Sequence, residues 1–382
     1  MNLKKIIRKA HLWLGFSSGI VVFIVSLTGC IYAFQQEIQD MVQPYRFVEH
    51  VGETPLSIHK IKAIAESELD GKKARRIYRF SDDRAIKVLF YGKGYYHAVF
   101  VDPYTGAVLK SKDMYYDFFT IVLELHRHLL IPGDVGELIV PIATLVFLIL
   151  MFTGVYLWWP KNLTGAKKRL KIAWNVKWQR KNYDLHTVLG FYSTWVLIFI
   201  AITGLVWGFT WFDNGLYFVT SGGKTLEERP KYSSDTTQVN HVLNPYDKVY
   251  SRLKSESEQY KNVVFLLPKE TKDPLLVLTN DYTDRYQNME YHYYDQHTLE
   301  KFKTPERLGP FDEASTALKI RKLNYDIHTG SVFGLFGKFI AFFASLISTS
   351  LPITGFIMWK GRRKNKRMPK EKKEAKLVEE MA

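Results

Sequence analysis

The chain has 382 residues, a formal net charge of +15 and one cysteine, Cys30, which excludes an intramolecular disulfide and any cysteine-based zinc or iron–sulfur site. Of its 53 Lys and Arg residues, 22 lie in three short stretches that hold only 5 acidic residues and border long apolar runs: 1–10, 160–185 and 360–382. This is the positive-inside pattern of membrane proteins, and it argues against nucleic acid as a partner.

The first apolar run extends from Leu12 to Phe34 and contains no charged residue. At about 1.5 Å per residue, a helix of this length crosses a hydrocarbon core of roughly 30 Å. The run is too long for a signal peptide, and no small-residue cleavage site follows it. We therefore predict a cytoplasmic N-terminus at 1–10 and a first transmembrane helix at 11–37.

Residues 38–134 have the pattern of an α+β domain. A helix-like segment at 58–69 precedes two alternating apolar segments at 85–90 and 96–101, which are typical of half-buried strands. An Asp-containing turn, Asp102 to Gly106, follows the second of them. We predict a folded domain on the non-cytoplasmic side of the membrane.

The second and third transmembrane helices are predicted at 135–159 and 186–212, joined by the basic cytoplasmic loop 160–185. The second apolar run ends in Trp158-Trp159-Pro160-Lys161. Tryptophan is enriched at the membrane interface and lysine on the cytoplasmic side, so this ending orients the helix.

Residues 213–327 repeat the pattern of the first outer segment. The matching parts are a helix-like segment at 246–256, strand segments at 263–267 and 275–278, and an Asp-containing turn from Asp295 to Leu299. We predict a second α+β domain on the same side as the first.

The fourth transmembrane helix is predicted at 328–359, followed by the basic cytoplasmic tail 360–382. Its only charged residue, Lys338, lies near its start, where a long side chain can reach the interface. Both termini are then cytoplasmic, and the two outer domains are periplasmic in a protein of a bacterial inner membrane.

The chain is an internal tandem repeat of one helix–domain–helix unit. The first and third spans share His, then Gly at +4, Phe at +5, Ser at +7 and Thr-Gly at +17. The second and fourth spans share a preceding His, an internal Thr-Gly and a terminal Trp. The equivalent histidines and Thr-Gly pairs are His11, Thr28-Gly29 and His186, Thr203-Gly204 in one set, and His126, Thr153-Gly154 and His328, Thr354-Gly355 in the other.

These four histidines are the candidate functional residues. His11 and His186 open spans at the cytoplasmic face, whereas His126 and His328 precede spans at the outer face. A single histidine at a helix end is most simply an interfacial residue or a cap, but four at repeat-related positions indicate a function. Two histidines from different helices at equal depth could ligate one haem iron axially.

Two alternatives remain open for the residues around the histidines. The small residues Gly15, Ser18, Gly190 and Ser193 would leave room for a flat macrocycle, but they would equally allow close helix packing. Zinc is disfavoured because the apolar segments lack the further ligands that it needs.

The nearest competitor for a ligand role is His128, and His126 is preferred because His328 occupies the matching place in the repeat. Arg127 could pair with a haem propionate or anchor at the interface. The remaining histidines are predicted to be surface residues: His50, His59, His97, His241, His292 and His297.

No familiar motif for NAD(P)H, a flavin or a nucleotide is present, and no nucleophile elbow or paired-cysteine redox motif either. If the protein moves electrons, they come from a separate donor.

Over nearly all of residues 1–360 the chain resembles the PepSY-associated transmembrane-helix proteins, bacterial inner-membrane proteins that include di-haem iron–siderophore reductases. The resemblance rests on the four histidines in their local sequences, the four Thr-Gly pairs, Leu157-Trp158-Trp159-Pro160, and Val101-Asp102-Pro103-Tyr104-Thr105-Gly106, which looks like the signature turn of the PepSY domain.

The resemblance implies a b-type cytochrome with two haems, one held by His11 and His186 and the other by His126 and His328. Electrons from a quinol or a flavoprotein would cross the membrane and reduce a periplasmic ferric siderophore, which would release Fe(II). The second PepSY-like segment departs from the pattern, with Gln296 and Leu299 in place of Pro103 and Gly106, and this puts its role in doubt.

Two other functions fit the sequence. PepSY domains also occur as regulatory modules, in which case the histidines would be packing residues. A small-solute transporter is the third possibility, although four spans leave little room for a central pathway and lack paired acidic residues.

Overall fold

The computed structural model describes residues 2–49, 54–160, 166–237, 244–256, 260–281 and 285–367. The chain divides into two compact units. The helical unit comprises residues 1–33, 122–212 and 328–382, and the sheet unit comprises residues 34–121 and 213–327. The end of the basic tail, 368–382, lies outside the described residues, as do 161–165 of the basic loop.

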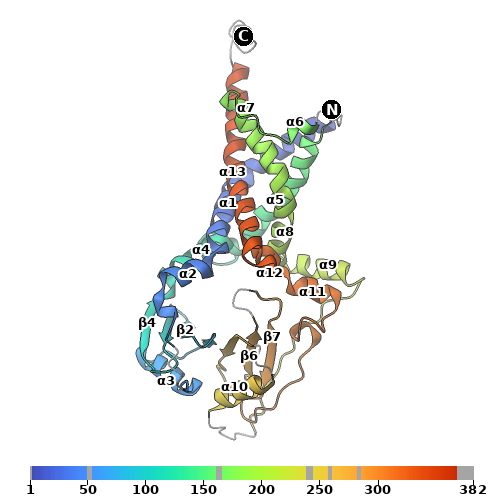
Figure 1. Ribbon diagram of the computed structural model, residues 1–382. Coiled ribbons are helices and arrows are strands. Elements are labelled where there is room, and N and C mark those ends of the chain that lie inside the picture. The colour runs from blue at the N-terminus through green and yellow to red at the C-terminus, as the bar shows by residue number, and fades with distance from the viewer. Residues whose placement is uncertain are drawn as a thin grey trace. The chain divides into compact units, whose positions relative to one another are not determined.

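Four long helices form the helical unit (Figure 1): α1 (Leu3–Ala33), α5 (Asp134–Trp158), α8 (Gly190–Gly208) and α13 (Gly334–Arg367). The described residues contain four segments long and apolar enough to cross a membrane, and each lies on one of these helices, as predicted. Helix α1 packs against α5 and α13, and α8 packs against the same two helices. The order around the bundle is therefore α1, α5, α8, α13, with α1 and α8 at opposite corners.

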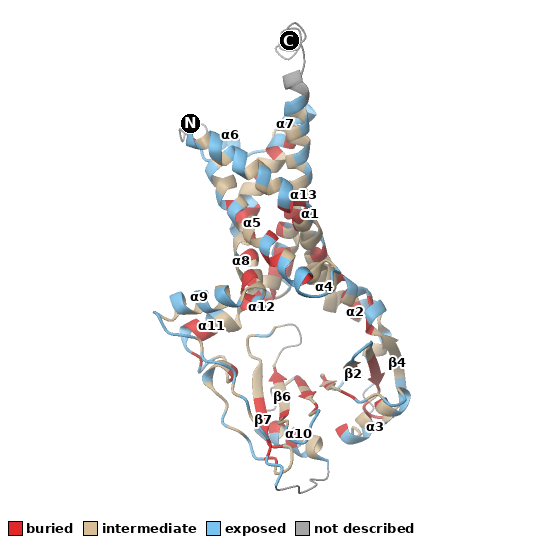
Figure 2. Cartoon of the chain, turned by 180° about the vertical axis from the view of Figure 1, so that it is seen from behind, coloured by how far each residue is buried: buried red, intermediate tan, exposed pale blue. Residues whose placement is uncertain are grey.

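The bundle has the exterior of a membrane protein. Large apolar side chains point outward, including Ile20 (72% exposed), Phe199 (61%) and Phe336 (71%), and Figure 2 shows exposed and half-buried residues along these helices. Small polar residues are buried between them, and the Ser26 and Ser348 hydroxyls lie 2.8 Å apart across α1 and α13. Helices in lipid pack through small and hydrogen-bonding residues, because burying apolar surface brings no gain there.

Short helical segments flank the bundle, and two of the candidate histidines, His126 and His328, lie on them. They are α4 (Phe118–His128), α6 (Ala166–Arg169), α7 (Trp178–Asp184), α12 (Asn324–Thr329) and the 3-10 turn η6 (Ser331–Phe333). The third span begins earlier than the predicted residue 186, because the chain is helical from Trp178 through a π-helical segment, η4 (Leu185–Leu189), into α8.

The sheet unit contains one antiparallel sheet of seven strands in the order β4-β3-β2-β1-β5-β6-β7. The strands are β1 (Arg76–Arg79), β2 (Ile86–Gly92), β3 (Tyr95–Val101), β4 (Val108–Asp113), β5 (Asn262–Leu266), β6 (Leu275–Asn280) and β7 (Glu290–Tyr294). Its other elements are α2 (Gln35–Val42), η1 (Pro44–Arg46), α3 (Ile58–Glu68), η2 (Met114–Tyr116), α9 (Thr210–Thr220), α10 (Pro245–Glu256), η5 (Glu306–Leu308) and α11 (Thr316–Lys322).

The expectation of two separate outer domains is corrected by this sheet. Strand β1 of the first half pairs with β5 of the second, with Ile77 opposite Phe265. Both of these side chains are fully buried in one core that α3 and α10 cover together. The two halves are also joined through Asp247 on α10, which accepts a 2.6 Å hydrogen bond from the Ile58 N–H at the start of α3. The two PepSY-like segments therefore form one folded unit.

The Asp-containing turns of the two halves have the same geometry despite their different sequences. The Asp102 carboxylate accepts hydrogen bonds from the Tyr104 and Thr105 N–H groups, and the Asp295 carboxylate accepts those of His297 and Thr298. Each turn closes with a 3.0 Å backbone hydrogen bond, from Gly106 to Asp102 and from Leu299 to Asp295. Leu299 adopts φ +59°, where the first half has glycine at φ +78°.

Candidate functional site

Each of the four candidate histidines lies beside a Thr-Gly pair of another helix. The distances from the histidine Nδ1 to the threonine Oγ1 are 2.8 Å for His11–Thr153, 3.2 Å for His126–Thr28, 2.9 Å for His186–Thr354 and 3.0 Å for His328–Thr203. Within each repeat the two contacts are reciprocal. Each of the two spans, with the segment before it, supplies one histidine and also the Thr-Gly pair that receives the histidine of the other. We call each such arrangement a histidine seat.

The glycine of each pair allows the imidazole to lie against the helix backbone. A Cβ atom on Gly29, Gly204 or Gly355 would be 3.3 Å from the Cε1 of the seated histidine, and on Gly154 it would be 3.5 Å away. Contacts of 3.3 Å are tighter than most Cβ contacts. A larger residue at Gly29, Gly204 or Gly355 would therefore push the ring away, which explains the glycine at these three seats.

The hydrogen bonds of the seats fix which ring nitrogen carries the proton. Each threonine hydroxyl donates to a carbonyl of its own helix, as Thr28 does to Ile24 at 2.7 Å, so its oxygen is left to accept from the histidine. The His126 and His328 Nδ1 atoms also lie 2.9 and 3.0 Å from the Val25 and Ile200 carbonyl oxygens. A carbonyl can only accept, so Nδ1 is the protonated nitrogen and Nε2 keeps its lone pair for a metal.

The seats bring one histidine of each repeat together. The ring centroids of His126 and His328 are 6.1 Å apart with an interplanar angle of 76°, and the edge of Trp207 packs against His328 at 5.1 Å. A metal–nitrogen bond of roughly 2 Å, with the ring centre about 1 Å behind each nitrogen, separates two axial imidazoles on one metal by roughly 6 Å. His126 and His328 therefore have the spacing of bis-histidine ligation.

The other two candidate histidines, His11 and His186, come from opposite corners of the bundle. His11 lies on α1 and His186 on the segment that leads into α8. Together the two pairs occupy both ends of the bundle.

The donor set fits haem better than a metal ion bound by protein alone. Within the part of the chain that the structure describes, no group of three or more His, Cys, Asp or Glu residues could hold a metal. Each pair supplies two neutral nitrogen ligands, which is the number of axial ligands that a haem iron takes from protein in bis-histidine ligation.

The seat of His186 differs from that of His11. Asn182, one turn before His186 and 1% exposed, donates its Nδ2 to the Thr354 carbonyl at 3.0 Å, whereas the residue four before His11 is Ile7. The Asn182 Oδ1 is buried and has no hydrogen-bond partner among the described residues. His186 also lies in the π-helical segment, and such segments are frequent at functional sites.

The structure also places the other residues that the sequence analysis singled out near the histidines. His128 contacts Glu124 of its own helix at 3.0 Å and not a threonine seat, and Arg127 is exposed. A Cβ on Gly190 would lie 3.4 Å from Leu351, whereas one on Gly15 would meet no atom within 4 Å.

The prediction that the remaining histidines lie at the surface is wrong for His292. This residue is buried in the sheet, where its Nε2 lies 2.8 Å from the Thr279 hydroxyl, and burial lowers its pKa to about 4. His59 is exposed, and His97 and His297 are half-buried. His50 and His241 lie outside the described residues.

Sequence reasoning found the Thr-Gly pairs as repeat markers but did not assign them to the histidines. The signal was present, because the threonine follows 17 residues after His11 and His186, and 27 and 26 residues after His126 and His328. Asn182 carried no signal, since its counterpart in the first repeat is an isoleucine.

Comparison with known proteins is consistent with this architecture. A family model described as the PepSY-associated TM region matches residues 8–362, which is nearly the whole chain and includes all four histidine seats. A search of curated proteins returned no significant match.

Proposed function

This chain belongs to the family of the PepSY-associated TM region, and on that premise we propose that it is a di-haem b-type cytochrome of the bacterial inner membrane that reduces a ferric siderophore. Electrons enter from a cytoplasmic or membrane donor, cross the bilayer and reach the chelate in the periplasm, where Fe(II) is released. Siderophores hold Fe(III) far more tightly than Fe(II), so one electron is enough to loosen the metal.

The observation that carries the proposal is the fourfold repetition of the histidine seat. All four seats engage Nδ1, and the outer pair has a ring separation of 6.1 Å. If the histidines served only in packing, there would be no need for Nδ1 to be hydrogen-bonded at all four seats and for a glycine to lie against each imidazole ring.

The haems, when bound, would supply reversible one-electron chemistry at the two ends of the bundle. The chain's own residues orient the ligands. The threonine hydroxyl oxygens and the Val25 and Ile200 carbonyl oxygens accept hydrogen bonds from Nδ1–H. These bonds set the ring orientation and raise the basicity of Nε2.

The direction of transfer is inferred from charge. The basic stretches 1–10, 160–185 and 360–382 place both termini in the cytoplasm by the positive-inside rule, and they put His11 and His186 on that side. We infer that a quinol or a soluble flavoprotein serves as donor there, because the chain carries no familiar nucleotide or flavin motif of its own.

The test is an absorption spectrum of the detergent-purified full-length protein, oxidised and dithionite-reduced, with haem quantified per chain. Sharp reduced b-type bands with about two haems per chain are expected. A colourless protein, even after a haem precursor is added during expression, would overturn the proposal and favour a regulatory PepSY module.

A second measurement addresses the substrate. The reduced protein, kept anaerobic, should be reoxidised by a ferric siderophore and should release Fe(II) to a ferrous-specific dye. A protein that holds two haems but is not reoxidised by any class of ferric siderophore would remain a cytochrome with another oxidant.

A further inference from the structure

One face of the first half of the sheet, opposite the face that α3 and α10 cover, combines basic and aromatic side chains. Alternation along the strands and the strand register place them on this face: Arg76 and Tyr78 on β1, Lys87 and Tyr91 on β2, Phe100 on β3 and Lys112 on β4. Leu89, Ala98 and Phe100 form a small apolar cluster between them. We call the six residues given with the strands above, from Arg76 to Lys112, the basic face.

Lys87 lies at the centre of the basic face. In the register it stands between Tyr78 on one side and Phe100 on the other, and its Nζ lies 5.5 Å from the centroid of the Tyr78 ring. No carboxylate among the described residues comes within ion-pair distance of it. A cation–π contact is too weak to offset the burial of an unpaired ammonium group.

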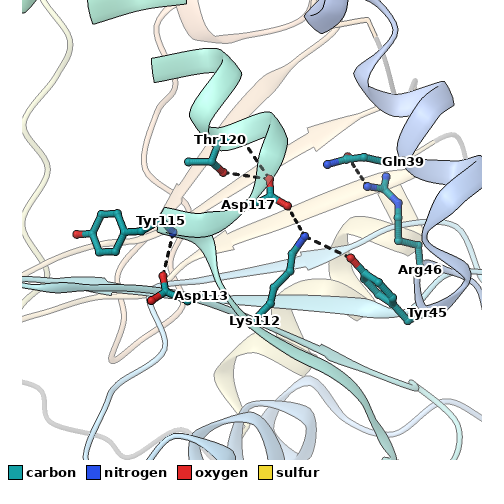
Figure 3. Close-up of polar contacts among 8 residues, drawn as sticks. All are labelled: Gln39, Tyr45, Arg46, Lys112, Asp113, Tyr115, Asp117 and Thr120. Carbon is teal, nitrogen blue, oxygen red and sulfur yellow. Dashed lines mark hydrogen bonds and ion pairs between the residues drawn. The ribbon is translucent and has the colours of Figure 1, made fainter. Parts of the chain in front are cut away.

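The neighbouring cations already use the carboxylates that lie near the basic face. Lys112 donates to Asp117 at 2.6 Å and to the Tyr45 hydroxyl at 3.3 Å (Figure 3). Arg46 lies 3.0 Å from an Asp40 oxygen and donates to Gln39.

Arg84 binds both oxygens of the same Asp40 carboxylate, at 2.7 and 3.0 Å. Asp40 and Asp117 thus serve three cations, and Lys87 adds a fourth, so positive charge is in excess.

Arg76 extends the excess along the face. Its guanidinium lies over the Tyr91 ring, 5.6 Å from the ring centroid, and no carboxylate among the described residues is its partner. Arg76 and Lys87 are therefore two cations on one sheet face that are paired only with aromatic residues.

The electrostatics of Lys87 agree with this geometry. Burial lowers its pKa to about 8, the positive charges of Lys112 and Arg46 act in the same direction, and Asp117 opposes them. An anion placed beside Lys87 would restore the pKa and remove the cost of the unpaired charge.

We propose that the basic face binds a negatively charged ferric chelate, with carboxylate or catecholate oxygens beside Lys87 and Arg76 and aromatic ligand rings against Tyr78 and Tyr91. The inference deepens the proposed function by naming its substrate class, and it rests on that function. A neutral or cationic ferric hydroxamate would leave both cations unpaired and is disfavoured.

The test is equilibrium binding of gallium(III) complexes to the full-length protein in detergent. Gallium(III) resembles Fe(III) in charge and size but is not reduced, so the measurement does not depend on haem or electron transfer. Triply anionic gallium tris-catecholate should bind, whereas neutral gallium tris-hydroxamate should bind at least ten-fold more weakly, and added salt should weaken the anionic complex.

Variants locate the site. Lys87→Met should weaken binding of the anionic complex about ten-fold or more, as expected for loss of a charge-assisted contact, and Lys87→Arg should restore most of it. The matched control is Lys60→Met, which removes the same charge from an exposed position on α3, the helix on the opposite face; its affinity should equal that of the wild type.

Three results would overturn the inference. They are equal affinity of Lys87→Met and wild type with both folded by circular dichroism, equal binding of the anionic and neutral complexes, or binding of phosphatidylglycerol micelles with no binding of the gallium complex. A protein that lacks haem but passes the binding test would instead refute the reductase proposal and leave the anion site standing.

Discussion

The helical and sheet units both contain a repeat, but they preserve different things. In the helical unit the same residue types recur, with histidine, threonine and glycine at every seat. In the sheet unit the Asp-containing turn keeps its hydrogen bonds while Gly106 is replaced by Leu299 and Pro103 by Gln296.

The difference follows from what each region has to provide. Under the proposed function a seat needs particular atoms, namely an imidazole nitrogen and a hydroxyl oxygen that holds it. A turn needs only a backbone path and a carboxylate to accept its N–H groups. The two halves therefore keep the same residue types in the seats, whereas in the turns they keep only the backbone geometry and its hydrogen bonds.

The largest expected effect comes from breaking a seat at its ligand. We expect His328→Ala to remove one of two haems, about half of the reduced b-type absorbance, because a haem held by one axial histidine is lost during purification. His128→Ala is the matched control, since that side chain contacts Glu124 of its own helix and lies in no histidine seat among the described residues. Unchanged haem content in His328→Ala would contradict its ligand role.

In the sheet unit the largest effect is expected from the turn carboxylate that accepts most hydrogen bonds. Asp295 is buried and accepts from the Asp235, His297 and Thr298 N–H groups. Asp295→Ala should destabilise the sheet unit by about 1–3 kcal/mol, because these donors lose their partner. Faster hydrogen exchange of the β6 and β7 amides would measure it, and unaltered exchange would argue against the turn as a stabilising element.

Removing a threonine hydroxyl leaves the histidine in place but takes away the group that orients it, so it tests orientation of the ligand separately from ligation. Thr153→Val should lower haem affinity about ten-fold at the cytoplasmic site, as is typical when an outer-shell partner is lost. Thr28→Val should have less effect, because the Val25 carbonyl still holds His126. Haem transfer to an apo-globin acceptor measures both, and equal losses would show that the carbonyl contributes nothing.

A small effect is expected where the two turns differ. Gly106 has φ +78°, so Gly106→Ala should cost about 1–2 kcal/mol from the left-handed backbone alone. The added Cβ would lie 3.0 Å from the Ile64 Cδ1 and 3.1 Å from the Leu56 Cδ1, the far ends of flexible side chains that can shift. Thermal unfolding followed by circular dichroism tests this, and a stabilised variant would show that the turn tolerates side chains freely.

The pH dependence should be weakest of all near neutrality. Burial alone would raise the pKa of Asp295, but hydrogen bonds from Thr298, Asp235 and His297 outweigh it, so the folded-state pKa is lowered. A carboxylate with a depressed pKa contributes stability above its unfolded pKa of about 3.9, and loses it as the pH falls through the folded value. Stability of the sheet unit should thus decline only in acid, and Asp295→Ala should show a shallower decline.

Much of this architecture could be read from local sequence. The four spans follow from apolar runs long enough to cross a bilayer, and the segments at 58–69 and 246–256 formed the helices α3 and α10. The predicted strand segments 85–90 and 263–267 correspond to β2 and β5. These features depend on composition and on periods of 2 and 3.6 residues, which neighbouring residues specify by themselves.

Contacts between distant segments could not be read in this way. The pairing of Tyr78 with Val264 joins the two halves into one sheet, and either strand alternates in the same manner whether or not the other is its neighbour. Likewise, alternation places Lys87 on a polar face, but only the positions of Lys112, Arg46 and their carboxylates show that its charge is unpaired.

The sequence by itself determined four membrane-length helices, an α+β region and four histidines at equivalent positions in a repeat. The tertiary structure decided that each histidine lies against the Thr-Gly pair of its neighbouring helix, and that His126 and His328 face each other at 6.1 Å. The physical reason is that a hydrogen bond between helices depends on their rotation and spacing, which side-chain packing sets throughout the bundle, while hydropathy and periodicity are properties of one segment alone.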